Sequence, residues 1–377
     1  MVITKLYIRN FRNIKEAELT FNNRLNIFIG KNAQGKTNLM EAVSVCLGGS
    51  FRHVKYSQYI PVTDNKAEVF IRLCFREDNN TSRENVVEYT ISNNKPLIKY
   101  NGLNVNDAAQ LYGVLKYVVF VPEHLNLIKG APELRRGYLD DVAVMQTQTH
   151  QKKLSNYNRG LKQRNNILAF AGKNIPADEL SAQLAPWNDI LAGEGINVTY
   201  GRLKYFEFLQ EYAAEMYSRL TEGAESLKME YYSSVFKTDS IDFSDVNGLF
   251  KKYVAEMENN LESEIKLHYT MAGIHRDDVN FFINGMSARD FASQGQVRSA
   301  ALSLKLSEAE MIRRRNHTCP VIILDDILSE LDHVRRNFVI NNIDNSQVFI
   351  TCCNMDDLSA LKGGKSWRTE NGCFTEV

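Results

Sequence analysis

Eight residues near the start of the chain have the types and spacing of a phosphate-binding loop: Gly30-Lys31-Asn32-Ala33-Gln34-Gly35-Lys36-Thr37. The two glycines leave room for backbone N–H groups to curl around phosphate oxygens. Lys36 is placed to reach the β and γ phosphates of a nucleoside triphosphate, and Thr37 can offer its hydroxyl to Mg²⁺, which prefers oxygen ligands. A glycine turn before an ordinary helix is the alternative interpretation, so the loop needs support from a second motif.

An acidic pair much later in the chain supplies that support. Four apolar residues at positions 321–324 predict a buried strand, and Asp325-Asp326 follow directly. Carboxylates at the carboxyl end of such a strand lie where α/β proteins keep their ligands. Asp325 can hold Mg²⁺, and Asp326 can orient or deprotonate an attacking water molecule. Taken alone, the pair is more typical of a helix cap or turn, but the upstream loop favours a metal site.

A polar turn near the N-terminus, Arg9-Asn10-Phe11-Arg12-Asn13, carries two further candidates. Guanidinium groups bind phosphates and stack on bases, so Arg9 and Arg12 could line the pocket of the nucleotide. The same five residues are equally consistent with an ordinary polar turn, and the sequence leaves both interpretations open.

Hydrophobic periodicity predicts the elements that position these residues. The apolar run at 25–29 predicts a strand leading into the loop, and residues 39–47 have a helical pattern. Asn101-Gly102 is a strong hairpin signal. Alternating apolar residues predict strands at 2–8, 17–21, 69–75, 86–91 and 96–100. The first two are expected to lead into the loop strand, and the last three to form an antiparallel sheet inserted after the first helix.

The middle of the chain changes to a helical pattern between residues 133 and 264, interrupted by Pro176, Pro186 and the glycines at 160, 172, 193 and 195. Because interior proline costs a helix about 3 kcal/mol, several short helices are expected rather than one long coiled coil. Strands are predicted again at 279–283, before Asn284-Gly285, and at 348–350. The predicted organisation is a head in two parts, 1–130 and 266–377, with a helical lobe, 131–265, inserted between them.

The composition describes a soluble protein with a large core. The chain has 377 residues, is 44% hydrophobic, and carries 45 basic and 45 acidic residues, so any contact with DNA must come from local basic clusters. No apolar run approaches the roughly 18 residues of a membrane span, and no leader segment is evident. The six cysteines form no C-x-x-C pair, so reduced thiols, no zinc and a cytoplasmic location are expected.

Together, these motifs resemble those of the ABC ATPase class. The loop, the segment Ser293-Gln294-Gly295-Gln296-Val297-Arg298, Leu324-Asp325-Asp326 and Ser329-Glu330-Leu331-Asp332 correspond to its Walker A, signature, Walker B and D-loop motifs. The resemblance implies an α/β fold: an ABC-type P-loop ATPase head with an antiparallel β subdomain and an inserted α-helical lobe. Two heads of this class sandwich ATP between the loop of one and the signature serine of the other. It therefore implies an ATP-dependent homodimer in which Ser293 and Gln296 serve the partner's nucleotide.

Within that class the chain resembles the RecF family of bacterial recombination mediators, nearly end to end. The resemblance rests on Asn10-Phe11-Arg12-Asn13, Pro122-Glu123, Arg135-Arg136, His275-Arg276-Asp277-Asp278 and Ser293-Gln294-Gly295-Gln296. It implies a slow, DNA-stimulated ATPase that acts as a switch, with Lys36 and Asp326 as catalytic residues and ATP and Mg²⁺ as cofactors. It also implies binding to double-stranded DNA near single-strand gaps or junctions, and action with RecR and RecO to place RecA.

The sequence departs from the class at two positions. Where the class often has a histidine after the last strand, this chain has Thr351-Cys352, so the contact with the γ phosphate is expected to be weaker or supplied by another group. Asp326 stands where the class usually has glutamate, and its carboxylate is one methylene shorter, which fits slow hydrolysis. The glutamine that normally precedes the inserted lobe has no clear equivalent, with Glu123 or His124 as candidates.

Three arginine clusters are candidates for the DNA surface: Arg135-Arg136, Arg313-Arg314-Arg315 and Arg335-Arg336. The alternative for each is an ordinary solvated face.

Three other kinds of protein are disfavoured. About 130 inserted residues folded into two helices would reach only about 100 Å, and no cysteine lies between Cys74 and Cys319 to form a zinc hook, which argues against a long-armed ATPase. The insertion is too large for a transporter's nucleotide-binding subunit, and the Ser293 segment argues against a metabolic kinase.

Overall fold

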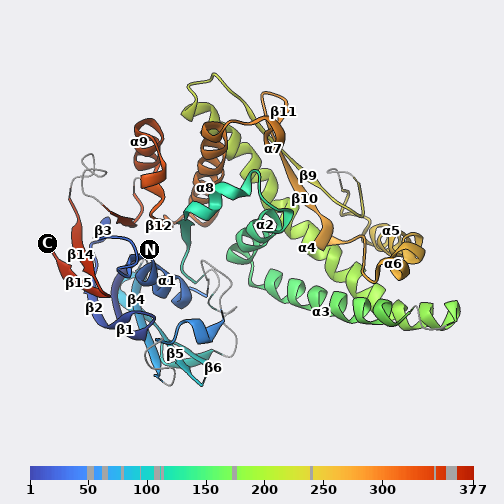
Figure 1. Ribbon diagram of the computed structural model, residues 1–377, viewed down its shortest axis with the longest axis horizontal. Helices are drawn as coiled ribbons and strands as arrows, with labels where there is room; N and C mark the ends of the chain where they lie inside the picture. Colours follow the sequence, from blue (N-terminus) through green and yellow to red (C-terminus); the bar gives the residue numbers. More distant parts are fainter. Residues whose placement is uncertain are drawn as a thin grey trace. The chain divides into compact units, whose positions relative to one another are not determined.

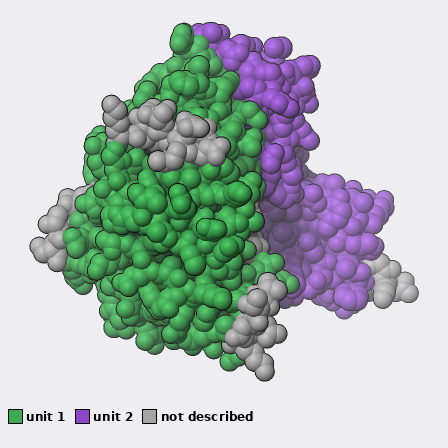
Figure 2. Space-filling model, turned by 60° about the vertical axis from the view of Figure 1, so that its left-hand side comes forward, with its two compact units in different colours: residues 1–125, 215–222, 298–377 green, residues 126–214, 223–297 purple. Residues whose placement is uncertain are grey.

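The structure, a computed structural model, forms two compact units. It describes residues 1–48, 55–61, 67–77, 80–93, 95–105, 111, 114–171, 176–237, 241–343, 345–353 and 363–377. The first unit comprises Met1–Leu125, Glu215–Glu222 and Arg298–Val377, and the second comprises Asn126–Ala214 and Gly223–Val297 (Figures 1 and 2). Both chain ends therefore belong to the first unit.

A mostly parallel sheet forms the core of the first unit. Its strand order is β15-β14-β3-β13-β12-β8, and all neighbouring pairs are parallel except β14 and β15. The strands are β3 (Leu25–Ile29), β8 (Tyr117–Phe120), β12 (Val321–Asp325), β13 (Val348–Cys352), β14 (Lys365–Glu370) and β15 (Cys373–Glu376). Because β3, β13 and β12 are parallel neighbours, their carboxyl ends meet at one edge of the sheet.

The first unit also contains an antiparallel sheet with the order β2-β1-β4-β5-β6-β7. Its strands are β1 (Val2–Phe11), β2 (Ile14–Thr20), β4 (Val69–Glu77), β5 (Asn80–Ser92), β6 (Lys95–Tyr100) and β7 (Leu103–Val105). The predicted strands are confirmed, but β1 and β2 pair within this sheet instead of joining β3. Helix α1 (Lys36–Cys46) contacts strands of both sheets, which explains why nine of its eleven residues are buried.

Further helices lie wholly or partly in the first unit. They include the 3-10 helices at Tyr56–Gln58, Pro122–Leu127, whose last two residues lie in the second unit, and Ile327–Glu330, and the α-helices α8 (Gln294–Asn316), whose first turn lies in the second unit, and α9 (His333–Asn342). In the described part of the chain, no helix combines the length and the apolar character that crossing a bilayer requires.

The second unit combines helices with a small antiparallel sheet (Figure 1). Its helices are α2 (Pro132–Gln146), α3 (Gln148–Phe170), most of α4 (Ala177–Leu220), α5 (Val246–Asn259), α6 (Leu261–Leu267), the 3-10 helix Ile274–Arg276 and α7 (Ala288–Phe291). The sheet has the order β11-β10-β9, with β9 (Leu227–Tyr232), β10 (Asp278–Ile283) and β11 (Met286–Ser287).

This sheet extends the second unit beyond residue 265, where the inserted lobe was predicted to end. Strand β10 pairs along its whole length with β9, from Asp278 opposite Tyr232 to Ile283 opposite Leu227. Because the two strands share backbone hydrogen bonds, residues up to Val297 belong to the second unit, and the lobe is not purely helical.

The expectation of several short helices is wrong for α4, which continues for 44 residues through Pro186. The lost backbone bond is offset by apolar packing on either side of the proline, where Leu184 and Leu191 are buried. Glycine within α4 does not end the helix, and at Gly195 it allows a neighbouring helix to pack closely. A Cβ at Gly195 would lie 2.6 Å from the hydroxyl oxygen of Tyr253 on α5.

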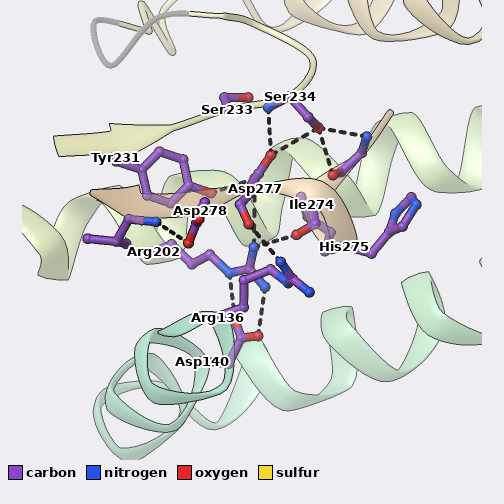
Figure 3. Close-up of polar contacts among 12 residues, drawn as sticks. Arg136, Asp140, Arg202, Tyr231, Ser233, Ser234, Ile274, His275, Asp277 and Asp278 are labelled. Carbon is purple, nitrogen blue, oxygen red and sulfur yellow. Dashed lines mark hydrogen bonds and ion pairs between the residues drawn. The ribbon is translucent and has the colours of Figure 1, made fainter. Parts of the chain in front are cut away.

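A buried polar network joins the helices of the second unit to its sheet (Figure 3). Asp277, which is only 1% exposed, accepts a hydrogen bond from the hydroxyl of Tyr231 at 2.5 Å. Arg202 of α4 donates to both carboxylate oxygens of Asp140 and to the carbonyl oxygen of Ile274. Burial raises the pKa of Asp277, and the nearby Arg202 opposes that shift. The segment Ile274–Asp278 therefore ties α2 and α4 to β9.

Candidate nucleotide site

The phosphate loop connects β3 to α1 and borders a cavity of about 240 Å³. The cavity is lined by Asn32, Ala33, Gly35, Lys36, Thr37, Asn38 and Asp326. The structure thus brings most of the predicted loop together with one residue of the distant acidic pair. Gly30, Lys31 and Gln34 belong to the loop but not to the lining.

Lys36 is buried and its ammonium group is held against the loop. Nζ donates to the carbonyl oxygens of Gly30 at 2.7 Å and Lys31 at 3.1 Å, and lies 3.9 Å from Sγ of Cys353. These contacts hold the ammonium group, which carries three N–H donors and a full positive charge, against the backbone of the phosphate loop. An anion at the loop would meet that charge directly.

Thr37 joins the loop to the end of β12. Its hydroxyl donates to Oδ1 of Asp325 at 3.2 Å, a contact between residues 288 positions apart in the chain. Burial raises the pKa of Asp325, while hydrogen bonds from Thr351 and Thr37 lower it. A hydroxyl and a carboxylate oxygen side by side are the oxygen ligands that Mg²⁺ prefers, so the predicted metal ligands fit that ion.

Asp326 lines the cavity, and one of its carboxylate oxygens has no hydrogen-bond partner among the described residues. Its backbone has φ of 56°, a left-handed conformation that is uncommon for residues other than glycine. Its Oδ1 is buried and has no hydrogen-bond partner among the described residues. A buried, unpaired carboxylate oxygen at the cavity is suited to accept a hydrogen bond from a water molecule.

Thr351 holds both aspartates through one hydroxyl group. Its Oγ1 donates to Oδ1 of Asp325 at 2.7 Å and accepts from the backbone N–H of Asp326 at 2.9 Å. Because Thr351 is only 1% exposed and its hydroxyl is committed to these bonds, it does not take the place of the missing histidine. Cys352 is buried, and it is the next residue, Cys353, whose thiol reaches the loop, with Sγ 3.1 Å from Oδ1 of Asn32.

A C-terminal hairpin that the sequence analysis missed supports the loop from the other side. The turn between β14 and β15 donates two backbone hydrogen bonds to Gln34: Gly372 N–H to the carbonyl oxygen and Asn371 N–H to Oε1, both at 2.8 Å. Gly372 has φ of +78°, and a Cβ there would lie 2.3 Å from the carbonyl oxygen of Asn13. The Asn-Gly pair is the sequence signal that predicts such a turn.

The two arginines of the N-terminal turn do not line the cavity. Arg12 forms an ion pair with Glu41 of α1, with Nε 2.7 Å from Oε2, and its guanidinium lies over the ring of Tyr59. Arg9 lies near Glu68, with Nη2 3.4 Å from Oε1. In this structure both serve as ties within the first unit, and contact with a nucleotide stays a prediction.

The signature residues Ser293 and Gln296 belong to the second unit and begin α8. The backbone N–H of Ser293 donates to Oε1 of Gln296 at 2.8 Å, and the N–H of Gln296 donates to Oγ of Ser293 at 3.2 Å. This reciprocal pair is a capping box, so Ser293 has a structural role whatever else it does. Its side chain is exposed.

Most of the predicted DNA-binding arginines are tied to neighbouring residues. Arg135 is 3% exposed and donates two hydrogen bonds to Asp278, so in this structure its guanidinium group is committed to the fold, and contact with DNA stays a prediction. Arg136 contacts Glu133 and the carbonyl oxygen of Asp277. The others are arranged as follows: Arg313 and Arg314 pair with Glu310 of the same helix, where Arg315 is half-buried; Arg335 pairs with Asp332; and Arg336 lies near the carbonyl of Leu331.

Comparison with known proteins places the chain in a family. It matches the model of the RecF/RecN/SMC N terminal domain over residues 2–369. The DNA replication and repair protein RecF of Clostridioides difficile (strain 630) is 36% identical over 352 residues, which cover 93% of this chain and 91% of that protein. The chain belongs to the RecF family.

Solved structures agree with this RecF assignment. The recombination mediator protein RecF-ATP in the RecFOR pathway matches with a TM-score of 0.89 and 29% identity, covering 100% of this chain and 97% of that chain. The SMC head bound to the C-winged helix domain of ScpA, at 15% identity and a TM-score of 0.57, covers 100% of this chain and 97% of that chain and shares the fold. The predicted fold class, an ABC-type ATPase head, is confirmed.

The two hydrogen bonds of Thr351 predict that it is a positioning residue for ATP hydrolysis. In Thr351→Val, Asp325 loses a donor and the Asp326 N–H loses its acceptor, each worth about 1–3 kcal/mol. We expect the hydrolysis rate to fall about tenfold or more, and the Mg²⁺ concentration for half-maximal activity to rise. Thr351→Ser keeps the hydroxyl and should retain both values. Loss in the serine variant with wild-type values in the valine variant would show that the methyl packing matters and the hydroxyl does not.

The hairpin contact predicts that Gly372→Ala weakens ATP binding by roughly tenfold, since two bonds to Gln34 contribute about 0.5–1.5 kcal/mol each. Gly102→Ala is the matched control. Gly102 also follows asparagine in a hairpin of the same unit, with φ of +82°, but a Cβ there meets nothing within 4 Å. Titration with a fluorescent ATP analogue measures both variants. Equal affinities in the two variants would show that the hairpin does not support the loop.

Proposed function

We propose that this RecF family member is an ATPase that uses ATP to switch its hold on DNA. The observation that carries the proposal is the contact between Thr37 Oγ1 and Asp325 Oδ1, which joins the phosphate loop to the acidic pair. The similarity to the solved structure of the recombination mediator protein RecF-ATP supports ATP as the ligand. Together, Lys36, Thr37, Asp325 and Asp326 offer the charge, the metal ligands and the proton acceptor that phosphoryl transfer to water requires.

Each residue of the site has a distinct part in this mechanism. Lys36 exchanges its contacts with the loop carbonyls for oxygens of the terminal phosphates. Thr37 and Asp325 would hold Mg²⁺, which would supply positive charge to offset the charge that develops on the phosphates during hydrolysis. Asp326 uses its unpaired Oδ1 to orient the attacking water and accept its proton. Because this carboxylate is shorter than the usual glutamate, slow hydrolysis is expected.

ATP binding is proposed to join two copies of the chain. Ser293 is exposed at the N-terminus of α8, where backbone N–H groups and the positive end of the helix dipole favour a phosphate. In the proposed dimer Ser293 and Gln296 of one copy contact the γ phosphate held by Lys36 of the other. Hydrolysis then removes the group that both copies share, and the dimer opens.

The dimer is proposed to bind double-stranded DNA next to single-strand gaps and to act with RecO and RecR in placing RecA. The support is the naming of its relatives, a DNA replication and repair protein and a recombination mediator in the RecFOR pathway. A dimer that closes on DNA when ATP binds and opens when ATP is hydrolysed releases the DNA after a time set by the hydrolysis rate.

Asp326→Asn tests the proposed switch, because it removes the proton acceptor while leaving Asp325 for Mg²⁺. ATP should still bind, hydrolysis should fall by about 10²-fold or more, and the closed dimer should keep its DNA longer in the same proportion. The measurement is dimer lifetime and DNA off-rate in excess ATP, followed by a chase.

Asp325→Asn is the control for this prediction, since it should weaken Mg²⁺ binding and give less dimer. Hydrolysis at the wild-type rate in Asp326→Asn, or rapid DNA release despite slow hydrolysis, would contradict the coupling between this residue and opening.

A further inference from the structure

Helix α3 lies in a long stretch of the chain without acidic residues. Between Asp141 and Asp178 there is no Asp or Glu in 36 residues, although the overall composition would place about four there. The same stretch has six basic residues: Lys152, Lys153, Arg159, Lys162, Arg164 and Lys173. Helix α3 contains the first five of them and is labelled in Figure 1.

Three of the five basic residues of α3, Lys152, Arg159 and Lys162, lie on its exposed face. The exposed positions recur at helical spacing and are all polar between residues 152 and 166: Lys152, Ser155, Arg159, Lys162 and Asn166, flanked by Asn158 and Gln163. The opposite face is buried in the second unit's core, where Tyr157 and Leu168 lie. The helix is therefore fixed by its apolar side and presents its cations to solvent.

These cations differ from Arg313, Arg314 and Arg335, which pair with glutamate or aspartate, in having no carboxylate partner among the described residues. Lys152, Arg159 and Lys162 form no ion pair with any residue that the structure describes. By contrast, buried Arg164 on the same helix pairs with Glu264, with Nη2 2.7 Å from Oε2. Exposed positive charge without local compensation is the part of a surface that attracts a polyanion most strongly.

We infer that the exposed face of α3 binds the phosphate backbone of duplex DNA, an inference that rests on the proposed function. From Lys152 to Lys162 the face is about 15 Å long, at about 1.5 Å per residue. Over that length a duplex presents about nine phosphate charges, so each of the three cations can reach one. Ser155 and Asn166 add hydrogen-bond donors of the kind that contact phosphate oxygens.

The chemistry of the face favours a duplex over a single strand. Proteins that bind single strands stack bases on aromatic side chains, and the exposed positions between 152 and 166 include no aromatic residue; exposed Phe170 lies at the end of α3, two turns beyond Lys162. Nothing on the face is arranged to read base edges, so the contact is expected to be independent of sequence.

The test is the salt dependence of DNA binding by the full chain in the presence of ATP. The variant carries Lys152→Gln, Arg159→Gln and Lys162→Gln, and the control carries Lys204→Gln, Lys251→Gln and Lys266→Gln. The control removes three exposed charges from the same unit, on helices that also carry glutamates. Duplex and single-stranded oligonucleotides of 30 nucleotides or base pairs serve as probes, and ATP affinity without DNA checks that each variant is folded.

The α3 variant should lose on the order of 100-fold in duplex affinity at 0.1 M salt, and the slope of log K against log salt should become shallower by about 2.7. The control should keep the wild-type slope. A wild-type slope in the α3 variant, an equal loss in the control, or a loss confined to the single strand would each overturn the inference. Failure of the wild-type chain to bind DNA with ATP would instead contradict the proposed function.

Discussion

The hydroxyl of Thr351 is the contact on which the geometry of the nucleotide site depends. One oxygen atom donates to the side chain of Asp325 and accepts from the backbone of Asp326, and Asp325 in turn accepts from Thr37 of the loop. Three strands from distant parts of the chain, β3, β12 and β13, must be adjacent and parallel for these bonds to form. The central sheet thus brings three separate segments of the chain together to form one site.

How far the sequence could predict this arrangement depends on how local each signal is. The loop, its strand and the acidic pair are contiguous patterns, and β3 begins and ends where the sequence predicts. The role of Thr351 was not predictable, because it depends on which strands are neighbours. The hairpin at Asn371-Gly372 did carry a local signal, and its absence from the prediction is a missed turn rather than a physical limit.

In the second unit, tertiary packing overrides a local sequence signal. Pro186 is a strong local signal against a helix, yet packing around Leu184 and Leu191 keeps α4 continuous through it. The Arg135-Arg136 run also has a role within the fold that its sequence does not reveal, because Arg135 forms an ion pair with Asp278.

The most direct measurement for the account is light scattering on a mixture of two variants, Lys36→Ala and Ser293→Arg, in ATP and Mg²⁺. Each variant alone should stay monomeric, because in a pair of identical copies both sites lack either the loop lysine or the signature serine. In the mixture, one site combines the intact loop of the Ser293→Arg chain with the intact Ser293 of the Lys36→Ala chain, so heterodimers should form. No association in the mixture, under conditions where the wild-type chain dimerises, would contradict a nucleotide site shared between two copies.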